Sequence, residues 1–307
     1  MGSCDCAISV TLEGRQHTYG PYASEKLRNH RGLEMKKVLL GSVTLLALTG
    51  TSFAADMAPR MYTKAAPVVA PIYNWSGFYA GLHAGYTFGD RTGVDTSGIL
   101  AGNIANVAAG ARAPSVGVNR DGFIGGGQIG WNWQASSPWV WGLDADISYT
   151  DVNSTTNFVT ILPPALGGAA GGSPLNNSLS SRMDYFGTVR GRVGYAWDRT
   201  MVYATGGLAY GRIENSAAFN NAANVVQFAG STRDTKTGYA VGGGIEHAWT
   251  GNWTVKAEYL YYDLGRNDVT VALVPGVAGA GGYISSFKND GHIVRAGLNY
   301  KFGGMGW

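Results

Sequence analysis

Charge is scarce in this sequence, cysteine is almost absent, and long hydrophobic runs are missing. Lys, Arg, Asp and Glu together make up 14% of the 307 residues, against roughly 25% in an average soluble domain. No stretch approaches the roughly 20 apolar residues that a membrane-spanning helix needs. These shortages argue against an ordinary soluble globule and exclude a membrane protein built from several helices.

The only cysteines are Cys4 and Cys6. Both precede the part of the chain that we expect to be exported, which therefore carries no disulfide and no thiolate for a metal or a nucleophile. The formal net charge is only +3, and nothing in its distribution suggests binding to nucleic acid.

Glycine, by contrast, is abundant, with 47 residues in the chain, or about twice the usual share. Mean hydropathy is −0.05. Transmembrane β-barrels combine these properties, because their strands alternate apolar and polar residues and so look soluble on average although one face meets lipid.

Residues 35–54 have the features of a secretory signal peptide. Lys36 and Lys37 precede an apolar stretch over 38–48, and small residues precede a cleavage point after Ala54. We expect residues 1–34 to come from a mis-assigned start codon; the alternative is a genuine segment that uses Cys4 and Cys6 for a metal or a lipid. Residues 55–74 contain three prolines and are predicted to form a flexible periplasmic lead-in. Residues 75–307 are then the folded domain.

Eight segments of this domain alternate apolar and polar side chains with a period of two, as barrel strands require. Met183 is assigned to the outward set of the fourth segment. The fold class is therefore predicted to be all-β, an eight-stranded antiparallel up-and-down transmembrane β-barrel. The segments are 78–88, 123–133, 139–149, 183–197, 202–210, 239–249, 253–261 and 294–302.

On each of these segments, the charged residues occupy the alternate positions that the large apolar side chains leave free, so the two kinds of side chain lie on opposite faces of the strand. An Arg or Lys facing lipid at the bilayer midplane costs about 2–4 kcal/mol, so the charged parity is assigned to the lumen. Five acids and five bases predict a paired charge network that fills a narrow barrel. Its predicted members are Asp144, Asp146, Asp184, Arg190, Arg192, Glu246, Lys256, Glu258, Arg295 and Lys301.

The connections alternate in length. Those at 135–138, 198–200 and 250–252 are tight, whereas the other four each exceed twenty residues. Because outer-membrane barrels have short periplasmic turns and long external loops, both termini are placed in the periplasm. The long connections are rich in Gly and Ala, a composition that also fits strands continuing above the membrane.

Aromatic residues give an independent check on this orientation, since they gather at membrane interfaces. Tryptophans flank the short turns and predict a periplasmic girdle of Trp131, Trp133, Trp139, Trp141, Trp197, Trp249 and Trp253. Tyrosines occupy the opposite strand ends and predict an external girdle of Tyr86, Tyr149, Tyr185, Tyr210, Tyr239, Tyr259 and Tyr261.

Six motifs at strand positions resemble a known family: NWSGFYAGLHAGY, GGGQIGWNWQ, GTVRGRVGYAW, YATGGLAYG, KAEYLYYDLG and VRAGLNYKF. They are similar to the small porin-family outer-membrane β-barrels of alphaproteobacteria, and the resemblance covers residues 74–302. It implies an eight-stranded barrel like the OmpA membrane domain, in a family of surface antigens with some haemin-binding members. Members usually end at an aromatic residue in the last strand, whereas here five residues follow Phe302. We favour Trp307 over Phe302 as the residue that the barrel assembly machinery reads.

Signs of catalysis or cofactor binding are weak. Residues 125–130 match G-x-G-x-x-G but lie inside a predicted strand, where a nucleotide-binding turn would need to open a helix. The dispersed histidines suggest no metal site. A hydrolase or acyltransferase centred on His83 is less favoured than a lumenal His bonded to a neighbouring Asp or Tyr. Haem binding remains an alternative, and the candidate iron ligands are Tyr283 in the last long loop and His292 near the rim of that loop.

The sequence therefore predicts a non-enzymatic protein of the outer membrane of a Gram-negative bacterium, with no cofactor. Its expected role is structural, in envelope integrity and as a surface antigen, with limited passage of small solutes. A porin-type channel and a haemin receptor are the alternatives. Expected partners are outer-membrane lipid, lipopolysaccharide and the barrel assembly machinery.

Overall fold

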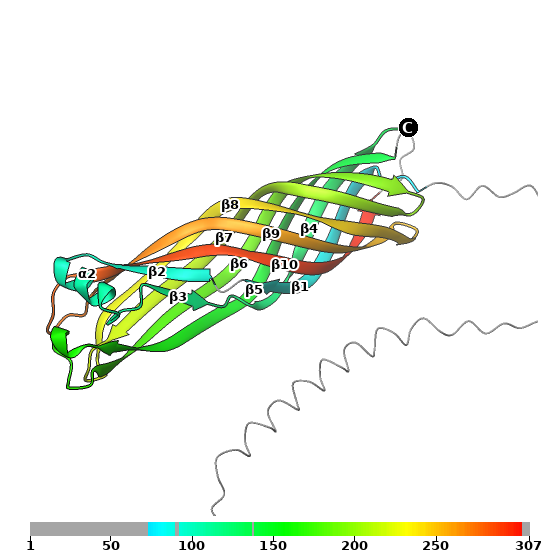
Figure 1. Cartoon of the computed structure of the whole chain (residues 1–307). Helices are drawn as coiled ribbons and strands as arrows, with labels where there is room; N and C mark the ends of the chain where they lie inside the picture. Colours follow the sequence, from blue (N-terminus) through cyan, green and yellow to red (C-terminus); the bar gives the residue numbers. More distant parts are fainter. Residues whose placement is uncertain (1–72, 90–91, 137, 303–307) are drawn as a thin grey trace, which may run out of the picture. The chain divides into compact units, whose positions relative to one another are not determined.

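The computed structural model describes residues 73–89, 92–136 and 138–302. Eight long antiparallel strands form a closed ring, because each pairs with the next and the last pairs with the first (Figure 1). The predicted fold class is thus confirmed. In chain order the strands are β1 (Gly77–Phe88), β4 (Gly122–Gln134), β5 (Trp139–Leu162), β6 (Ser173–Trp197), β7 (Thr200–Asn220), β8 (Val226–Thr250), β9 (Trp253–Leu273) and β10 (Gly282–Phe302).

Several predictions fall outside the described residues. These are the extension at 1–34, the signal peptide at 35–54, most of the lead-in at 55–74, and the choice of Trp307 as the terminal aromatic. Pro138, Asp198 and Gly251 lie in the short connections where these were predicted, and Asp198 and Gly251 have left-handed φ angles of 52° and 49° that tighten their turns.

Three of the four connections predicted to be long are mostly strand. Only residues 163–172, 221–225 and 274–281 separate the paired strands at that end, and the first of these includes the short helix η1 (Pro164–Leu166). The expectation of long loops is therefore wrong for these three, and the strands continue past the tyrosine girdle. We call this part the extension and assign to it residues 92–118, 151–184, 212–237 and 264–290.

The remaining long connection contributes its own elements to the extension. It forms β2 (Thr92–Gly98), α2 (Ala101–Ala108) and β3 (Ser115–Val118), and β2 pairs with the outer half of β10. Within the described residues, no helix is long and apolar enough to cross a membrane.

The predicted faces agree with the burial of the side chains, apart from one local inversion on β6. Phe78, Leu82, Phe123 and Ile129 illustrate the outward set, all more than 60% exposed. Met183, predicted to face outward, is instead 5% exposed and packs inside. The reason is a β-bulge between Met183 and Tyr185, which adds one residue to the strand and reverses the parity beyond it.

The interior is layered along the barrel axis, and β6 passes through every layer. Ala196 lies in an apolar cluster at the end with short turns, Arg190 in a charged layer, Phe186 in a second apolar cluster, and Leu179 in a third inside the extension. The lumen is therefore filled by side chains from end to end of the described strands.

Glycines on the inner face permit the close strand contacts of so narrow a ring. A Cβ added at Gly126 would lie 2.0 Å from the carbonyl oxygen of Ile147, whereas one at the neighbouring Gly127 faces outward and meets nothing closer than 3.8 Å. The G-x-G-x-x-G pattern lies within β4, so its glycines serve this packing.

We expect Gly126→Ala to lower the free energy of unfolding by about 1–3 kcal/mol, because the backbone of β5 must shift to admit the methyl group. Gly127→Ala is the matched control, and it should be neutral or slightly stabilising because alanine restricts the unfolded chain. Urea unfolding in lipid vesicles, followed by tryptophan fluorescence, measures both. Equal losses in the two variants would contradict the packing argument.

Candidate functional site

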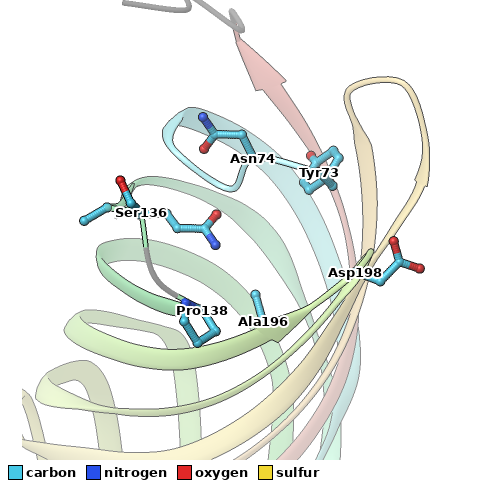
Figure 2. A pocket seen from close by; sticks show the side chains of 8 residues that line it. Tyr73, Asn74, Ser136, Pro138, Ala196 and Asp198 are labelled. Carbon is cyan, nitrogen blue, oxygen red and sulfur yellow. The ribbon is translucent and has the colours of Figure 1, made fainter. Parts of the chain in front are cut away.

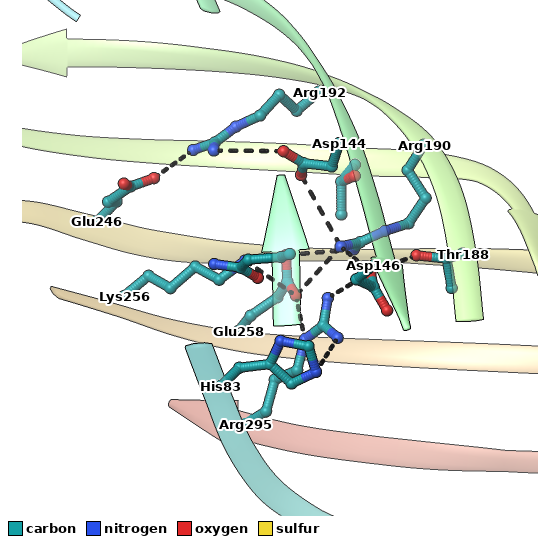
Figure 3. Close-up of polar contacts among 12 residues, drawn as sticks. His83, Asp144, Asp146, Thr188, Arg190, Arg192, Glu246, Lys256, Glu258 and Arg295 are labelled. Carbon is teal, nitrogen blue, oxygen red and sulfur yellow. Dashed lines mark hydrogen bonds and ion pairs between the residues drawn. The ribbon is translucent and has the colours of Figure 1, made fainter. Parts of the chain in front are cut away.

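Eight of the ten charged residues predicted for the lumen come together there (Figure 3). They project from five of the eight ring strands and each is at most 4% exposed. They are Asp144 and Asp146 from β5, Arg190 and Arg192 from β6, Glu246 from β8, Lys256 and Glu258 from β9, and Arg295 from β10.

Four of these side chains form a closed ring of ion pairs in which every base bridges both acids. Arg190 lies 3.2 Å from Asp146 and 3.2 Å from Glu258, and Arg295 lies 3.0 Å from Asp146 and 2.6 Å from Glu258. All four side chains have 0% exposure. Thr188 donates a further hydrogen bond to Asp146 at 2.5 Å.

A second group lies toward the end with short turns. Arg192 donates to Glu246 at 2.7 Å and to the hydroxyl of Tyr79 at 3.1 Å, and its guanidinium lies 4.0 Å from the ring centre of Tyr203. Asp144 lies 3.8 Å from both Arg190 and Arg192 and so links the two groups.

Charge balance explains how so many ionised groups tolerate burial. The network holds four acids and four bases, and desolvation of such groups is offset only when each has well-placed partners of opposite sign. Neutral donors complete the shell around Glu246, which accepts from Thr254 at 2.5 Å and from Asn299 at 2.9 Å. The network is therefore charge-balanced, and it joins side chains from five strands across the lumen.

Two predicted members lie elsewhere. Asp184 is the bulged residue of β6, and its carboxylate pairs with Arg182 and Arg233 on the outer surface. Lys301 lies near the end of β10, where its ammonium donates to the carbonyl of Asn74 and lies 4.4 Å from the ring centre of Tyr73. The alternation identified the charged face but carried no information on bulges or on depth along the axis.

Sequence reasoning missed the neutral members of the network. Tyr79, Gln128, Thr188, Tyr203 and Asn299 all face inward and bond to one another or to the charges. Their positions in the alternation could have identified them, because they fall on the inward face of their strands, where a polar side chain needs a hydrogen-bond partner inside the lumen.

Among the lumenal residues that the structure describes, His83 has an arrangement that resembles part of a catalytic triad. Its Nε2 lies 2.7 Å from the hydroxyl of Ser148 and 3.3 Å from Arg295, so its partners are not the predicted Asp or Tyr. A triad also needs a carboxylate on Nδ1. In the described part of the chain nothing bonds to Nδ1 of His83, and the ring is 4% exposed.

The end with short turns is closed by the residues just before β1. Trp75 is 2% exposed inside the ring, its backbone amide donates to Gln134 at 2.9 Å, and Tyr73 packs edge-on against it. Beside them lies a cavity of about 670 Å³ that opens at the mouth and is lined in part by Ser136 and Asp198 (Figure 2). The cavity is therefore an open recess at this end of the barrel.

Comparison with known proteins settles the family. The family model described as the outer membrane protein beta-barrel domain matches residues 44–302. The chain belongs to this family. It is therefore an outer-membrane β-barrel protein, and the predicted location is confirmed.

The relatives of this barrel protein include alphaproteobacterial outer-membrane proteins. The 31 kDa outer-membrane immunogenic protein of Brucella melitensis is 35% identical over 87% of this chain and 100% of its own length. The 25 kDa outer-membrane immunogenic protein of Brucella abortus is 25% identical over 87% and 99%. The 22 kDa outer membrane protein of Rhizobium leguminosarum is 26% identical over 76% and 81%.

Solved structures similar to this barrel protein include OprG from Pseudomonas aeruginosa, with a TM-score of 0.42 and 11% identity over 74% of this chain and 96% of that one. Neisserial surface protein A has a TM-score of 0.31 and 16% identity over 74% and 98%.

Both aromatic girdles lie on the outer surface of this barrel. The seven tryptophans flank the short turns and are 41–66% exposed. At the other end Tyr86, Tyr149, Tyr239 and Tyr259 are 41–69% exposed, and Tyr185, Tyr210 and Tyr261 are half-buried. As in other outer-membrane barrels, we therefore expect the short turns on the periplasmic side and the extension outside the cell.

The two candidate haem ligands face different surroundings in this barrel. Tyr283 has 0% exposure, inside the extension between Phe219 and Phe228. His292 lies on the outer face, stacked on Phe88 and bonded to the hydroxyl of Tyr259 at 2.7 Å. One side chain thus lies inside the extension and the other on the outer face, so the two do not converge on a common site.

Proposed function

We propose that this protein is a sealed structural barrel, which spans the outer membrane without a resting channel and carries an ordered extension at the cell surface. The observation that carries this proposal is the ring of Asp146, Arg190, Glu258 and Arg295, whose side chains have no exposed surface. A conducting pore needs a continuous water path, and such a path would expose these groups.

The other layers support the same function. Trp75 and Tyr73 fill the periplasmic mouth, and apolar clusters fill the lumen on the external side of the charged layer. A solute would need to displace all of these layers to cross. The barrel would then contribute to the envelope by occupying and stiffening the membrane, which matches its charge-balanced interior.

A role as a surface antigen is the second part of the proposal. The extension rises beyond the external girdle and presents polar strand faces to the outside, and two relatives are named for being immunogenic. Antibodies raised against the folded protein should bind intact cells, and substitutions at the exposed Thr155 and Asn157 of β5 should alter that binding.

Planar-bilayer recording tests whether the barrel is sealed. We expect no stable conductance from the purified protein, whereas the paired variant Asp146→Ala/Arg295→Ala should pass intermittent small currents, because it removes two plugging side chains and keeps the charge balanced. Arg266→Ala, at an exposed ion pair of the extension, is the control and should stay silent. Stable channels in the unmodified protein that shrink or change selectivity in Arg190→Ala or Glu258→Ala would instead identify a porin.

A further inference from the structure

A cluster of charged side chains lies on the outer surface of β6, β7 and β8, directly beyond the external tyrosine girdle. Its members are Arg182 and Asp184 from β6, Arg212 and Glu214 from β7, and Arg233 from β8. The function proposed above gives this cluster no role, since its ion pairs are formed among its own members and not with the charged network in the lumen.

Strand register brings the cluster together. Arg182 is opposite Glu214, and Glu214 is opposite Arg233, so these three side chains form a row across the strands. The bulge at Asp184 turns its carboxylate to the same side, as bulges commonly re-aim a side chain. Arg212 lies in the next row, opposite Tyr185.

Asp184 holds two of the guanidinium groups side by side. Its carboxylate accepts from Arg233 Nη2 at 2.6 Å and lies 3.0 Å from Arg182 Nε. Desolvation of Asp184 opposes its ionisation, but the hydrogen bond from Arg233 and the charges of Arg233, Arg182 and Arg212 outweigh it and lower the pKa of this carboxyl. The carboxylate is therefore a fixed anchor for the bases around it.

The cluster keeps a surplus of positive charge that is open to the outside. Three arginines face two acids, and the side chains of Arg182 and Arg233 are 54% and 51% exposed. Elsewhere in the described extension, Arg266 pairs with Asp95 and Lys288 with Asp290, one base to one acid. A guanidinium has five donor N–H groups in a planar fork, so an arginine that bonds one carboxylate retains donors for a second anion.

Depth identifies which anions this surface meets. Arg182 lies two register positions beyond Tyr185, because Asp184 between them is the bulged residue, and two positions span about 7 Å along a strand. Tyrosines of such a girdle mark the edge of the hydrocarbon core, and the polar headgroup layer begins there and extends several ångströms outward. The three arginines thus lie at headgroup depth in the leaflet that faces the outside of the cell.

We propose that Arg182, Arg212 and Arg233 bind a phosphate group of lipopolysaccharide in the surrounding outer leaflet. The phosphate monoesters of lipid A carry one to two negative charges each, and paired arginines recognise such groups by charge-assisted hydrogen bonds. Asp184 acts as a positioning residue that sets the spacing of Arg182 and Arg233. The site holds one lipopolysaccharide molecule of the lipid shell around the barrel against strands β6, β7 and β8.

Binding of bis-phosphorylated lipid A to the folded protein in detergent micelles tests this proposal. We expect Arg182→Gln/Arg233→Gln to weaken binding tenfold or more, and Arg266→Gln, which alters an equally exposed but neutral ion pair, to weaken it less than twofold. Binding of the unmodified protein should also weaken as salt concentration rises. The difference in gel migration between heated and unheated samples verifies that each variant is folded. If the double variant does not fold, the single exposed substitution Arg212→Gln repeats the test.

One binding comparison and two displacement assays distinguish the source of the anion. Lipid A stripped of its phosphates should bind at least tenfold more weakly, and neither inorganic phosphate nor heparin should displace lipid A at equal concentration. Equal binding of the dephosphorylated lipid, or equal losses in the double variant and Arg266→Gln, would overturn the proposal. Displacement by inorganic phosphate would show a free-anion site, and displacement by heparin a polysaccharide site, and either result would also overturn it.

Discussion

Glu258→Gln should lower the free energy of unfolding of the barrel by about 3–5 kcal/mol, as expected when one partner of a buried ion-pair network is removed. Glu258 accepts from Arg295 at 2.6 Å and from the hydroxyl of Tyr203 at 3.0 Å, and it also faces Arg190 and Lys256. Glutamine keeps the shape of the side chain but leaves three buried cations with one charge too few to balance them.

Urea unfolding in lipid vesicles measures this loss, and two further variants show its origin. Glu214→Gln removes a half-exposed carboxylate 3.8 Å from Arg233 and should cost less than about 1 kcal/mol. Adding Lys256→Met to Glu258→Gln removes the surplus charge and should restore part of the stability, since a balanced apolar replacement of a buried ion pair is often tolerated. A double variant no more stable than Glu258→Gln would show that packing, and not charge, sets the cost.

The charged layer could be predicted from the sequence because lipid forbids charge on one face. Asp144 and Asp146 on one strand, and Arg190 and Arg192 on the next, share a parity opposite Trp141 and its outward neighbours. A strand has only two faces, so this placed them in the lumen without knowledge of any contact. Which base pairs with which acid depends on strand tilt and stagger, and these are not encoded in the alternation.

Local irregularity limited the remaining site predictions. A single extra residue at Asp184 reverses the faces of Met183 and Arg182, and no residue in that stretch of sequence marks a bulge. Lys301 has the correct parity but lies too near the periplasmic mouth to reach an acid. Both cases show that face is predictable from period two, whereas depth and register are not.

The extension was the largest structural feature that the sequence left open. Its strands invert the pattern of the membrane strands, with apolar side chains inside and polar ones outside: on β6, for instance, Leu175 and Leu179 are buried while Asn176 and Arg182 are exposed. This inversion is the signal that a strand has left the lipid, because water and not hydrocarbon then surrounds the barrel. Short apolar side chains and many glycines and asparagines made the inversion weak.

Phe219→Ala should unfold the extension locally while the membrane part of the barrel stays intact. Phe219 is 2% exposed, packs edge-on against Tyr283 with ring centres 5.4 Å apart, and lies 5.2 Å beneath the guanidinium of Arg112. Removing a buried phenyl ring costs about 3–5 kcal/mol. The extension has its own apolar cluster, separate from those of the membrane part of the barrel, so the loss is concentrated there.

Hydrogen exchange resolved by peptide is the measurement, because it separates the two parts of one strand. In Phe219→Ala, residues 212–237 should exchange at least tenfold faster, whereas residues 200–210 of β7 should be unchanged, since the charged layer and the lipid hold them. Ile161→Ala is the control: this side chain is 50% exposed on β5, so it should leave both rates unchanged. Equally faster exchange along the whole of β7 would contradict this prediction. It would mean that the extension and the membrane part of the barrel unfold as one cooperative unit, in which the apolar cluster of the extension also stabilises the ion-pair network.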